Sequence, residues 1–383
     1  MKITYKSELG KYMTFEHSKF KPVFGWFWYK EGYAPELVDF SFDFEKISQF
    51  ENPIILDPFC GTGTTLLSSK IKGFDSIGVD ASSLAVFLSK VKTSDYSKED
   101  LELALKFLDK KLPQNESYRW DFELFSARAA FPKRNYNEIL SLRSAIESEE
   151  GLVRDLLLFA LLSILPQASI IQKDGGVLKI KKEKRALPAK EIFRRKVKQI
   201  VRDISTINYF GHSPSIYLGD ARALDIQDES VDLVVTSPPY LNNIDYSKIY
   251  GLELSLLEMS KSAAQAMRMR ALRSYIGSDM AVSQMPPEVG EIGEKIPIIG
   301  TYFKDMEQAI SQMYRVLKPS RSAHINVSNS VIHETHVLVD EVFAEMAERI
   351  GFSDVEIIVG SERVADVKPA KVKTRESIVI MRK

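Results

Sequence analysis

The 383-residue sequence predicts an α/β fold, with a parallel sheet that is interrupted by a mainly helical insertion. An apolar run at 54–56 leads into a glycine turn, a helical pattern at 66–71 and a second strand that ends at Asp80. Strand, helix and strand at this spacing form a βαβ unit, which implies parallel pairing. Between residues 97 and 210 the apolar spacing changes to about 3.6, the period of an amphipathic helix.

The remaining elements continue this α/β pattern on either side of the insertion. Helical patterns are expected at 35–40, 84–90, 101–108, 136–146, 152–164, 302–317 and 337–350, and further strands at 215–218, 231–235, 323–327, 355–359 and 377–381. A polar stretch at 260–300 interrupts the second half. We therefore expect a core formed by residues 1–96 and 211–383, and a helical insertion at 97–210.

Composition and charge are those of a globular chain without an overall nucleic-acid signature. Lys plus Arg equals Asp plus Glu at 52 each, so any surface for a polyanion has to be local. The single cysteine excludes an internal disulfide and fits a reducing cytoplasm. No signal-peptide pattern opens the sequence, and no apolar run reaches the ~20 residues that span a bilayer. We expect a cytoplasmic protein without a membrane partner, and a buried helix at 156–164.

The first motif, Asp57-Pro58-Phe59-Cys60-Gly61-Thr62-Gly63-Thr64-Thr65, stands between the first strand of the βαβ unit and its helix. Glycine lacks a β-carbon, so the backbone at Gly61 and Gly63 can approach a ligand closely. The helix N-terminus behind this turn favours an anionic group. An ATPase phosphate loop is excluded because the sequence has no Gly-x-x-x-x-Gly-Lys-Ser/Thr, and Leu66 occupies the place of the third glycine in the nicotinamide fingerprint.

Three acids are expected at the carboxyl edge of the sheet, where open α/β sheets bind ligands. Asp57 ends one strand, Asp80 ends the next, and Asp220 follows the strand at 215–218. A carboxylate at the place of Asp80 can accept hydrogen bonds from ribose hydroxyls. The alternative for Asp80 is a capping role on the helix that follows it.

The second motif, Thr236-Ser237-Pro238-Pro239-Tyr240, follows the apolar run at 231–235. An exocyclic amino group on a nucleobase is a poor nucleophile, because its lone pair is delocalised into the ring. Ser237 Oγ and the backbone carbonyl of Pro238 can accept hydrogen bonds from its two N–H groups, which localises that lone pair. The prolines stiffen the loop, and the Tyr240 ring offers a face on which an extruded base can stack. A structural turn after a buried strand is the alternative.

With both motifs in one chain, the sequence resembles the amino-methylating DNA methyltransferases of restriction–modification systems, in particular the cytosine-N4 enzymes. In that family Asp-Pro-Phe-x-Gly-x-Gly-Thr-Thr binds S-adenosyl-L-methionine and Ser-Pro-Pro-Tyr performs catalysis, and both motifs stand intact at 57–65 and 237–240. The resemblance covers residues 20–96 and 210–383 and implies a Rossmann-like class I S-adenosylmethionine-dependent methyltransferase sheet. It implies duplex DNA as the substrate, with the target base flipped, and a cognate restriction endonuclease as a candidate partner.

The resemblance also assigns roles to single residues. It implies that the segment at 30–38 is the family's extra cofactor-binding helix and that Asp80 holds the ribose. The residues that it places along the methionine part of the cofactor are Asp57, Phe59, Gly61, Gly63 and Thr64. The chemistry of the cofactor adds that Asp57 can pair with its ammonium and Asp220 with its adenine amino group. The expected cofactor contacts are Asp57, Pro58, Phe59, Gly61, Gly63, Thr64, Thr65, Asp80, Ala81, Asp220 and Ala221, and the expected catalytic residues are Ser237, Pro238, Pro239 and Tyr240.

Two features depart from the family pattern. The cofactor motif precedes the catalytic motif, whereas many Ser-Pro-Pro-Tyr enzymes have the reverse order, and the insertion at 97–210 is not the family's usual place for target recognition. Ser237, in place of Asp or Asn, favours cytosine over adenine as the target base. The alternatives are adenine-N6 methylation, methylation of an RNA amino group, and a catalytically silent DNA-binding protein on the same scaffold.

A DNA surface is expected in the insertion, which is the candidate DNA-recognition lobe. The run at 179–202 holds 11 basic residues against Glu183 and Glu191, next to a loop with Gly175 and Gly176. Such an excess suits a phosphate backbone, and a solvated helix face is the alternative. The candidate DNA contacts are Lys181, Lys182, Arg194 and Arg195, with Arg268, Arg270 and Arg273 as a second group.

Metal-free chemistry is expected. The five histidines are scattered, and no His/Cys cluster suggests a metal site. Methylation of a ring carbon usually needs a cysteine nucleophile, but Cys60, the only cysteine, lies inside the glycine turn. We expect Cys60 to pack as a small apolar residue.

Overall fold

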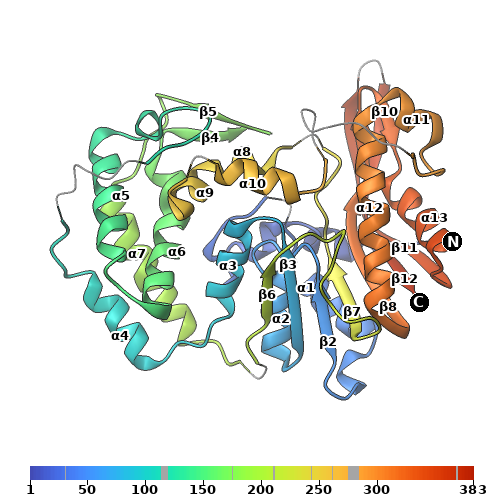
Figure 1. Cartoon of the computed structure of the whole chain (residues 1–383), viewed down its shortest axis with the longest axis horizontal. Helices are drawn as coiled ribbons and strands as arrows, with labels where there is room; N and C mark the ends of the chain where they lie inside the picture. Colours follow the sequence, from blue (N-terminus) through green and yellow to red (C-terminus); the bar gives the residue numbers. More distant parts are fainter. Residues whose placement is uncertain are drawn as a thin grey trace.

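A computed structural model of the chain describes residues 1–30, 32–113, 120–174, 176–209, 212–242, 244–260, 262–274, 284–367 and 370–383. Its main sheet has eight strands in the order β1-β11-β12-β8-β7-β2-β3-β6 (Figure 1). Gly175, in the loop that the sequence analysis placed beside the basic run, lies outside the described residues.

Five parallel strands form the part of the sheet that positions the site. They are β2 (Ile54–Asp57), β3 (Asp75–Asp80), β6 (Ser215–Leu218), β7 (Val231–Thr236) and β8 (Leu317–Ser328). Numbered by their order in the chain, they lie across the sheet as 3-2-1-4-5, which is the Rossmann order. The predicted Rossmann-like α/β class is therefore confirmed.

The C-terminal hairpin completes the sheet on the side of β8. β12 (Ala370–Arg382) pairs antiparallel with both β8 and β11 (Asp354–Val367), and β1 (Lys2–Tyr5) pairs parallel with β11 at the edge. β11 and β12 are longer than the strands expected at 355–359 and 377–381, because their pairing continues past an irregularity between Val359 and Ser361. The sequence pattern did not indicate β1.

Helices cover both faces of the sheet (Figure 1). On one face α12 (Pro297–Val316) and α13 (Val339–Ile350) bury Phe303 and Phe343 in a cluster that includes residues of β7, β8, β11 and β12. On the other face α1 (Pro35–Phe44) packs Leu37 with Ile55 and Leu233. Every residue of β7 is buried, as expected of a strand that is covered on both faces. α2 (Thr64–Lys72) and α3 (Ser83–Thr93) follow β2 and β3 along the chain.

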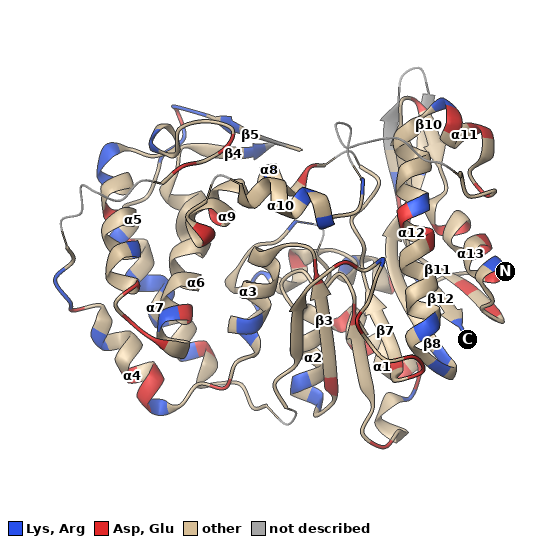
Figure 2. Ribbon diagram, viewed as in Figure 1, with Lys and Arg blue, Asp and Glu red and all other residues tan. Residues whose placement is uncertain are grey.

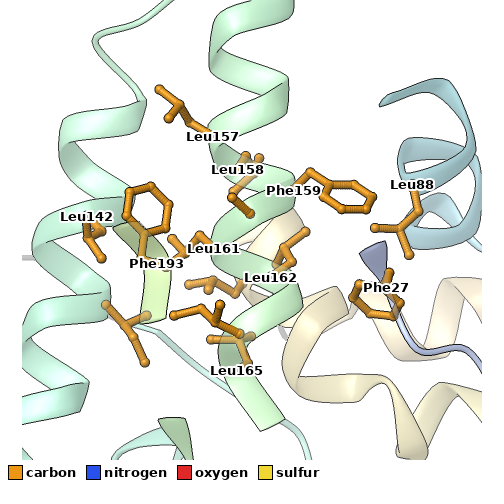
Figure 3. Close-up of a cluster of buried hydrophobic side chains, with 14 of the residues drawn as sticks. Phe27, Leu88, Leu142, Leu157, Leu158, Phe159, Leu161, Leu162, Leu165 and Phe193 are labelled. Carbon is orange, nitrogen blue, oxygen red and sulfur yellow. The ribbon is translucent and has the colours of Figure 1, made fainter. Parts of the chain in front are cut away.

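A helical lobe lies beside the sheet and consists of α4 (Lys98–Phe107), α5 (Lys133–Ile146), α6 (Gly151–Ala168) and α7 (Ala189–Ile204). Figure 3 shows Leu158, Leu161 and Leu162 of α6 at the centre of its apolar core. Among the described residues, α6 is the one helix long and apolar enough to cross a membrane, and 61% of its residues are buried inside the protein. Its central position in the lobe explains this apolar composition.

The apolar core of the lobe reaches beyond the insertion. It includes Phe27 of the N-terminal segment and Leu88 of α3, which lie on the side of α6 that carries Phe159 (Figure 3). It also includes Leu254 of α9 (Gly251–Glu258) and Met267 of α10 (Ala263–Arg270). The domain boundaries expected from the sequence stay a prediction, and this packing adds α9 and α10 to the helical side.

Several short elements are absent from the sequence-based expectations. β4 (Ile171–Asp174) and β5 (Val177–Ile180) form a hairpin between α6 and α7, and β9 (Ser330–Ile332) and β10 (Thr335–Val337) form another. The polar stretch at 260–300 contains α10, α11 (Gly290–Lys295) and the start of α12. Together with α9 and α10, α8 (Tyr246–Ile249) lies over the carboxyl ends of the central strands (Figure 1). Short 3-10 helices occur at Ser7–Tyr12, Phe15–Ser18, Phe24–Trp26, Ile47–Gln49 and Ala127–Ala130.

Candidate active site

A cavity of about 820 Å³, here called the first cavity, lies at the carboxyl edge of the central strands. It lies where β2 and β7 are neighbours, which is the point at which the strand order reverses and where such folds bind ligands. The expected site residues that line it are Pro58, Phe59, Gly61, Asp80, Ala81, Asp220, Ala221, Ser237, Pro238 and Pro239.

The remaining wall of the first cavity comes from the segments around α8 and α10. Ile244, Met267 and Leu272 add apolar surface, and Asp245 and Arg268 add charged groups. The sequence analysis assigned only Arg268 among these five a role, and that role was DNA contact.

The glycine turn of the first motif wraps around Asp80. Gly61 has φ of +49° and Gly63 of +77°, in the left-handed region that favours glycine. The Gly61 N–H donates to Asp80 Oδ2 over 2.8 Å. A β-carbon on Gly63 would lie 3.0 Å from Ser89 Oγ, so this glycine lets the turn lie against α3. Gly61 borders the cavity, whereas Gly63 and Thr64 support the turn from behind.

Asp57 lies behind the turn, outside the lining of the first cavity. Its carboxylate accepts hydrogen bonds from Thr236 Oγ1 (2.6 Å), the Tyr33 hydroxyl (3.0 Å) and the Phe59 N–H (3.1 Å). Thr65 joins the same buried group, with its Oγ1 2.5 Å from the Tyr33 hydroxyl. Burial raises the pKa of Asp57 to about 6, although these donors act in the opposite direction. This geometry gives Asp57 a structural role, and its expected pairing with an ammonium group stays a prediction.

Asp80 is a half-buried acid in the wall of the first cavity. Its Oδ1 accepts from the Ser82 N–H and its Oδ2 from the Gly61 N–H, both over 2.8 Å. Burial raises the pKa of Asp80 to about 6, against the lowering effect of these N–H groups. The capping residue of α3 is Ser82, whose Oγ accepts from the Ala85 N–H. Each oxygen of Asp80 keeps a further lone pair that a ligand hydroxyl can use.

Asp220 forms an ion pair with Arg222 in the wall of the first cavity. Arg222 Nη2 lies 2.7 Å from Asp220 Oδ2, and Arg222 Nη1 lies 3.1 Å from Asp305 Oδ2. Arg273 pairs with the same Asp305 at 2.7 Å. Both oxygens of Asp220 already accept hydrogen bonds from Arg222, so the expected bond from an adenine amino group has to use the lone pairs that are left.

The Ser-Pro-Pro-Tyr loop separates the first cavity from a second one. Ser237, Pro238 and Pro239 line the first cavity, whereas Tyr240 lines the second cavity, which measures about 1200 Å³. Ser237 Oγ donates to the backbone oxygen of Asn326 in β8 over 3.1 Å. The hydroxyl proton therefore points to β8, and the Oγ lone pairs are left as acceptors.

Tyr240 is held by its hydroxyl group. This hydroxyl donates to Glu376 Oε1 over 3.1 Å and accepts from Asn326 Nδ2 over 3.0 Å. Glu376 Oε2 lies 3.4 Å from Arg363 Nη2 on the neighbouring strand. The ring is thus fixed from its far end in the wall of the second cavity.

Tyr29 and Lys30 line both cavities. The Tyr29 ring stacks on Tyr250, with centroids 4.6 Å apart and 9° between the planes. The Lys30 backbone N–H donates to the Tyr250 hydroxyl over 2.5 Å. Tyr29 was not among the site residues expected from the sequence. The signal that could have found it is the concentration of aromatic residues at 24–33, just before α1. Lys30 begins the segment at 30–38 that the resemblance assigned to the cofactor.

The second group of candidate DNA contacts surrounds the first cavity. Arg268 lies 2.6 Å from Glu123, and Arg270 Nε donates to the backbone oxygen of Ala81 over 3.2 Å. Arg273 carries the ion pair described above, and Arg268 and Arg270 line the cavity. These arginines are engaged within the protein, and their expected role in DNA binding stays a prediction.

The first group of candidate DNA contacts is divided between two surfaces. Lys181 and Lys182 follow β5 at the end of its hairpin, and Lys182 is exposed. Arg194 of α7 lies 3.4 Å from Asp109 near the end of α4, whereas Arg195 is exposed. Figure 2 shows basic residues on the β4–β5 hairpin, above the helical lobe, and at the end of α10, above the central strands.

The described residues contain no group of three or more His, Cys, Asp and Glu side chains that could hold a metal ion. Cys60 is buried with Leu66, Val86 and Ile216, and burial raises the pKa of its thiol. It therefore packs as a small apolar residue.

Comparisons with known proteins agree with this geometry. Residues 231–383 match the model of the N6/N4 family, described as a DNA methylase. The Type II methyltransferase M.AvaI of Nostoc sp. is 28% identical, over 93% of this chain and 84% of its own. The Type II methyltransferase M.BsoBI of Geobacillus stearothermophilus is 24% identical, over 97% of this chain and 88% of its own. The family model and these two relatives support an assignment to the amino-methylating DNA methyltransferases.

The part of the chain that matches the family model runs from β7 to the C-terminal strand. It contains the Ser-Pro-Pro-Tyr loop and several residues of the second cavity, whereas the cofactor motif precedes it. Among solved structures, an S-adenosylmethionine-dependent methyltransferase from Archaeoglobus fulgidus covers 91% of this chain and 95% of its own at 12% identity, with a TM-score of 0.34. That likeness is too weak to support any further inference.

Proposed function

We propose that this DNA methyltransferase transfers a methyl group from S-adenosyl-L-methionine to the exocyclic N4 amino group of a cytosine flipped out of duplex DNA. The observation that carries the proposal is the position of the Ser-Pro-Pro-Tyr loop between two cavities. One cavity is lined by the cofactor motif and the other by Tyr240. Transfer to a base requires such a pair of sites, because donor and acceptor have to meet in a fixed orientation.

The first cavity suits S-adenosyl-L-methionine, which is the methyl donor and supplies an electrophilic methyl group. Asp80 offers carboxylate lone pairs to the ribose hydroxyls, and Gly61 lets the backbone approach the methionine part. Phe59 and Leu272 provide apolar surface for the adenine. The N-terminus of α2 lies directly behind the turn and favours the carboxylate of the methionine part.

The second cavity suits an extruded base. A base that is stacked inside a duplex cannot bring its amino group to Ser237, so it has to leave the helix. Phe15 and Trp28 line this cavity together with Tyr240 and add aromatic surface. Polar groups of Asn329 and Glu376 also line it and can meet the heteroatoms of a base.

Ser237 and Pro238 prepare the amino group for attack. Because the Ser237 proton is donated to the backbone of Asn326, its Oγ is available to accept from the substrate. The carbonyl of Pro238 accepts from the second N–H. Two accepted hydrogen bonds localise the lone pair on the amino nitrogen. This nitrogen would form the new bond to the methyl carbon as the bond between that carbon and the cofactor sulfur breaks, so that S-adenosylhomocysteine leaves and the amino group loses one proton.

The cytosine assignment rests on Ser237 and on the resemblance to the cytosine-N4 enzymes. The two relatives are named Type II methyltransferases, and this context adds a cognate restriction endonuclease as a proposed partner. A cytoplasmic location follows from the same proposal.

The first experiment asks whether DNA is methylated and whether Ser237 is required. Purified protein is incubated with duplex DNA and methyl-labelled S-adenosyl-L-methionine. We expect label in the DNA with the wild type, and a strong loss of kcat with Ser237→Ala at unchanged cofactor affinity, because the lost acceptor acts on the reacting amine. Full activity of Ser237→Ala would contradict the catalytic role of the loop.

A further inference from the structure

We propose that Asn329 reads the target base by donating a hydrogen bond from its Nδ2 to a ring acceptor on the pairing edge of the base. The inference rests on the proposed function, because it takes the second cavity as the base site. Asn329 directly follows β8 and lines the second cavity together with Tyr240.

The side-chain amide of Asn329 is locked in one orientation. Its Oδ1 accepts from the Asp340 N–H at the start of α13 over 3.2 Å. A backbone N–H can only donate, so the amide oxygen has to face it and the amide nitrogen has to face away. The Asn329 N–H also donates to the backbone oxygen of Arg375 over 2.9 Å. The residue therefore cannot turn without breaking hydrogen bonds.

The Nδ2 of Asn329 has no acceptor within the described part of the chain, although the residue is only 5% exposed. A buried N–H without a partner is destabilising, and native proteins keep such a group rarely. A base in the second cavity brings the missing acceptor. A site of this kind rejects molecules that lack the acceptor, because its own buried donor then stays unpaired.

The chemistry of the four bases decides what this donor selects. Cytosine has an acceptor, N3, next to its amino group, and adenine has N1 in the equivalent place. Thymine and guanine carry an N–H there, which would meet the Asn329 donor with a second donor. Asn329 thus favours amino bases over keto bases, while Ser237 accepts from the amino group itself. Together the two residues read a donor and an acceptor at adjacent positions of one edge.

The test combines a protein change with a substrate change. The kcat/KM of the wild type and of Asn329→Ala is measured on a duplex whose target is either cytosine or 3-deazacytosine, in which a carbon replaces N3 and the amino group is kept. Each change alone should lower kcat/KM about tenfold. Both together should lower it no further, because non-additive effects are the sign of a direct contact. If the methylated base is adenine, 1-deazaadenine takes the place of 3-deazacytosine.

Three controls separate a lost contact from a damaged fold. The affinity of Asn329→Ala for S-adenosyl-L-methionine should equal that of the wild type, because Asn329 lies outside the first cavity. Thr335→Ala, in β10 and outside both cavities, should keep the wild-type kcat/KM. Asn329→Asp keeps an acceptor for the Asp340 N–H but has no donor, so it should lose at least as much activity as Asn329→Ala.

The outcomes distinguish this inference from the proposed function. Losses that multiply, or a wild-type kcat/KM in Asn329→Ala, would overturn the role of Asn329 and leave DNA methylation intact. A wild-type protein that methylates no DNA at all would overturn the proposed function itself.

Discussion

Asp80 is the side chain whose part in cofactor binding can be isolated most cleanly. Asp80→Ala removes both carboxylate oxygens from the first cavity. Hydrogen bonds to a charged group are worth ~1.5–3 kcal/mol each, so the affinity for S-adenosyl-L-methionine should fall about tenfold or more. Calorimetry measures the change. Asp75→Ala, at the opposite end of β3, is the matched control because Asp75 is exposed, and an unchanged affinity of Asp80→Ala would remove Asp80 from the site.

The raised pKa of Asp80 makes cofactor binding depend on pH. With a pKa of about 6, Asp80 takes up a proton as the pH falls through that value, and the protonated carboxyl is the weaker acceptor for ribose hydroxyls. The affinity should therefore decrease below a pH of about 6 and level off above it. Asp80→Asn cannot titrate and should flatten the profile. A remaining step near the same pH in this variant would be assigned to Asp57, whose pKa is also about 6.

At Tyr240 the contribution of the aromatic ring to DNA binding can be measured separately from that of the hydroxyl group. Tyr240→Phe removes the hydrogen bonds to Glu376 and Asn326 but keeps the ring. Tyr240→Ala should cost ~1–3 kcal/mol of DNA binding, the usual value of one base–aromatic stack, and Tyr240→Phe should cost clearly less. Binding to a fluorescent duplex, with cofactor affinity as the control, compares them. Equal losses would show that the hydroxyl, and not the ring, is what the DNA requires.

The local geometry explains why Asp80 lines the first cavity and Asp57 does not. Both acids end a strand before a turn, and the pattern shows nothing more than that. Hydrogen bonds from Tyr33 and Thr236 hold the Asp57 carboxylate outside the cavity lining, and these two residues are 24 and 179 positions away in the chain. The sequence also could not predict the orientation of the Asn329 amide, because that orientation depends on the hydrogen bond from the Asp340 N–H of α13 at the end of β8. Contacts between distant residues leave no periodic signal.

The β4–β5 hairpin and α7 divide the basic run into two parts that can be tested apart. Lys181 and Lys182 directly follow β5 of the hairpin, whereas Arg194 packs near the end of α4. We predict that Lys181→Gln with Lys182→Gln weakens DNA binding and flattens its salt dependence, by about 0.9 in slope for each lost phosphate contact. Cofactor affinity should not change.

Arg194→Gln with Arg195→Gln is the matched pair for this comparison. It removes the same charge from α7 and should alter the salt slope less. A slope that changes equally in both pairs would mean that the DNA also contacts α7. If neither pair changes the slope, the run is a solvated surface, and Arg268, Arg270 and Arg273 are the next candidates.

The longer elements were predictable because their apolar period covers many residues, as in α6 and α12. The hairpins were not, since β4, β5, β9 and β10 have three or four residues each, too few for a strand pattern to stand out. The sequence did not indicate the packing partner of α9, because apolar residues recur at the same helical spacing whether the helix packs on a sheet or on another helix. The sequence therefore predicted the turn between β2 and α2, and it did not predict α8 and α10, around which the rest of the wall of the first cavity is formed.

The fold brings the two motifs together across the whole chain. The first cavity collects residues from four strand ends, and the second adds the N-terminal segment and the C-terminal strand to the Ser-Pro-Pro-Tyr loop. Tyr29 and Lys30 border both cavities, so cofactor and base would meet along one continuous wall. We propose that the amino group of cytosine is methylated where these two cavities adjoin.

Mass spectrometry of nucleosides tests this claim most directly. Duplex DNA is incubated with the wild-type protein and isotope-labelled S-adenosyl-L-methionine, digested and analysed, with Ser237→Ala as the control. We expect labelled N4-methylcytosine with the wild type and almost none with the variant. Labelled N6-methyladenine would contradict the cytosine assignment, and label found only in RNA would contradict DNA as the substrate.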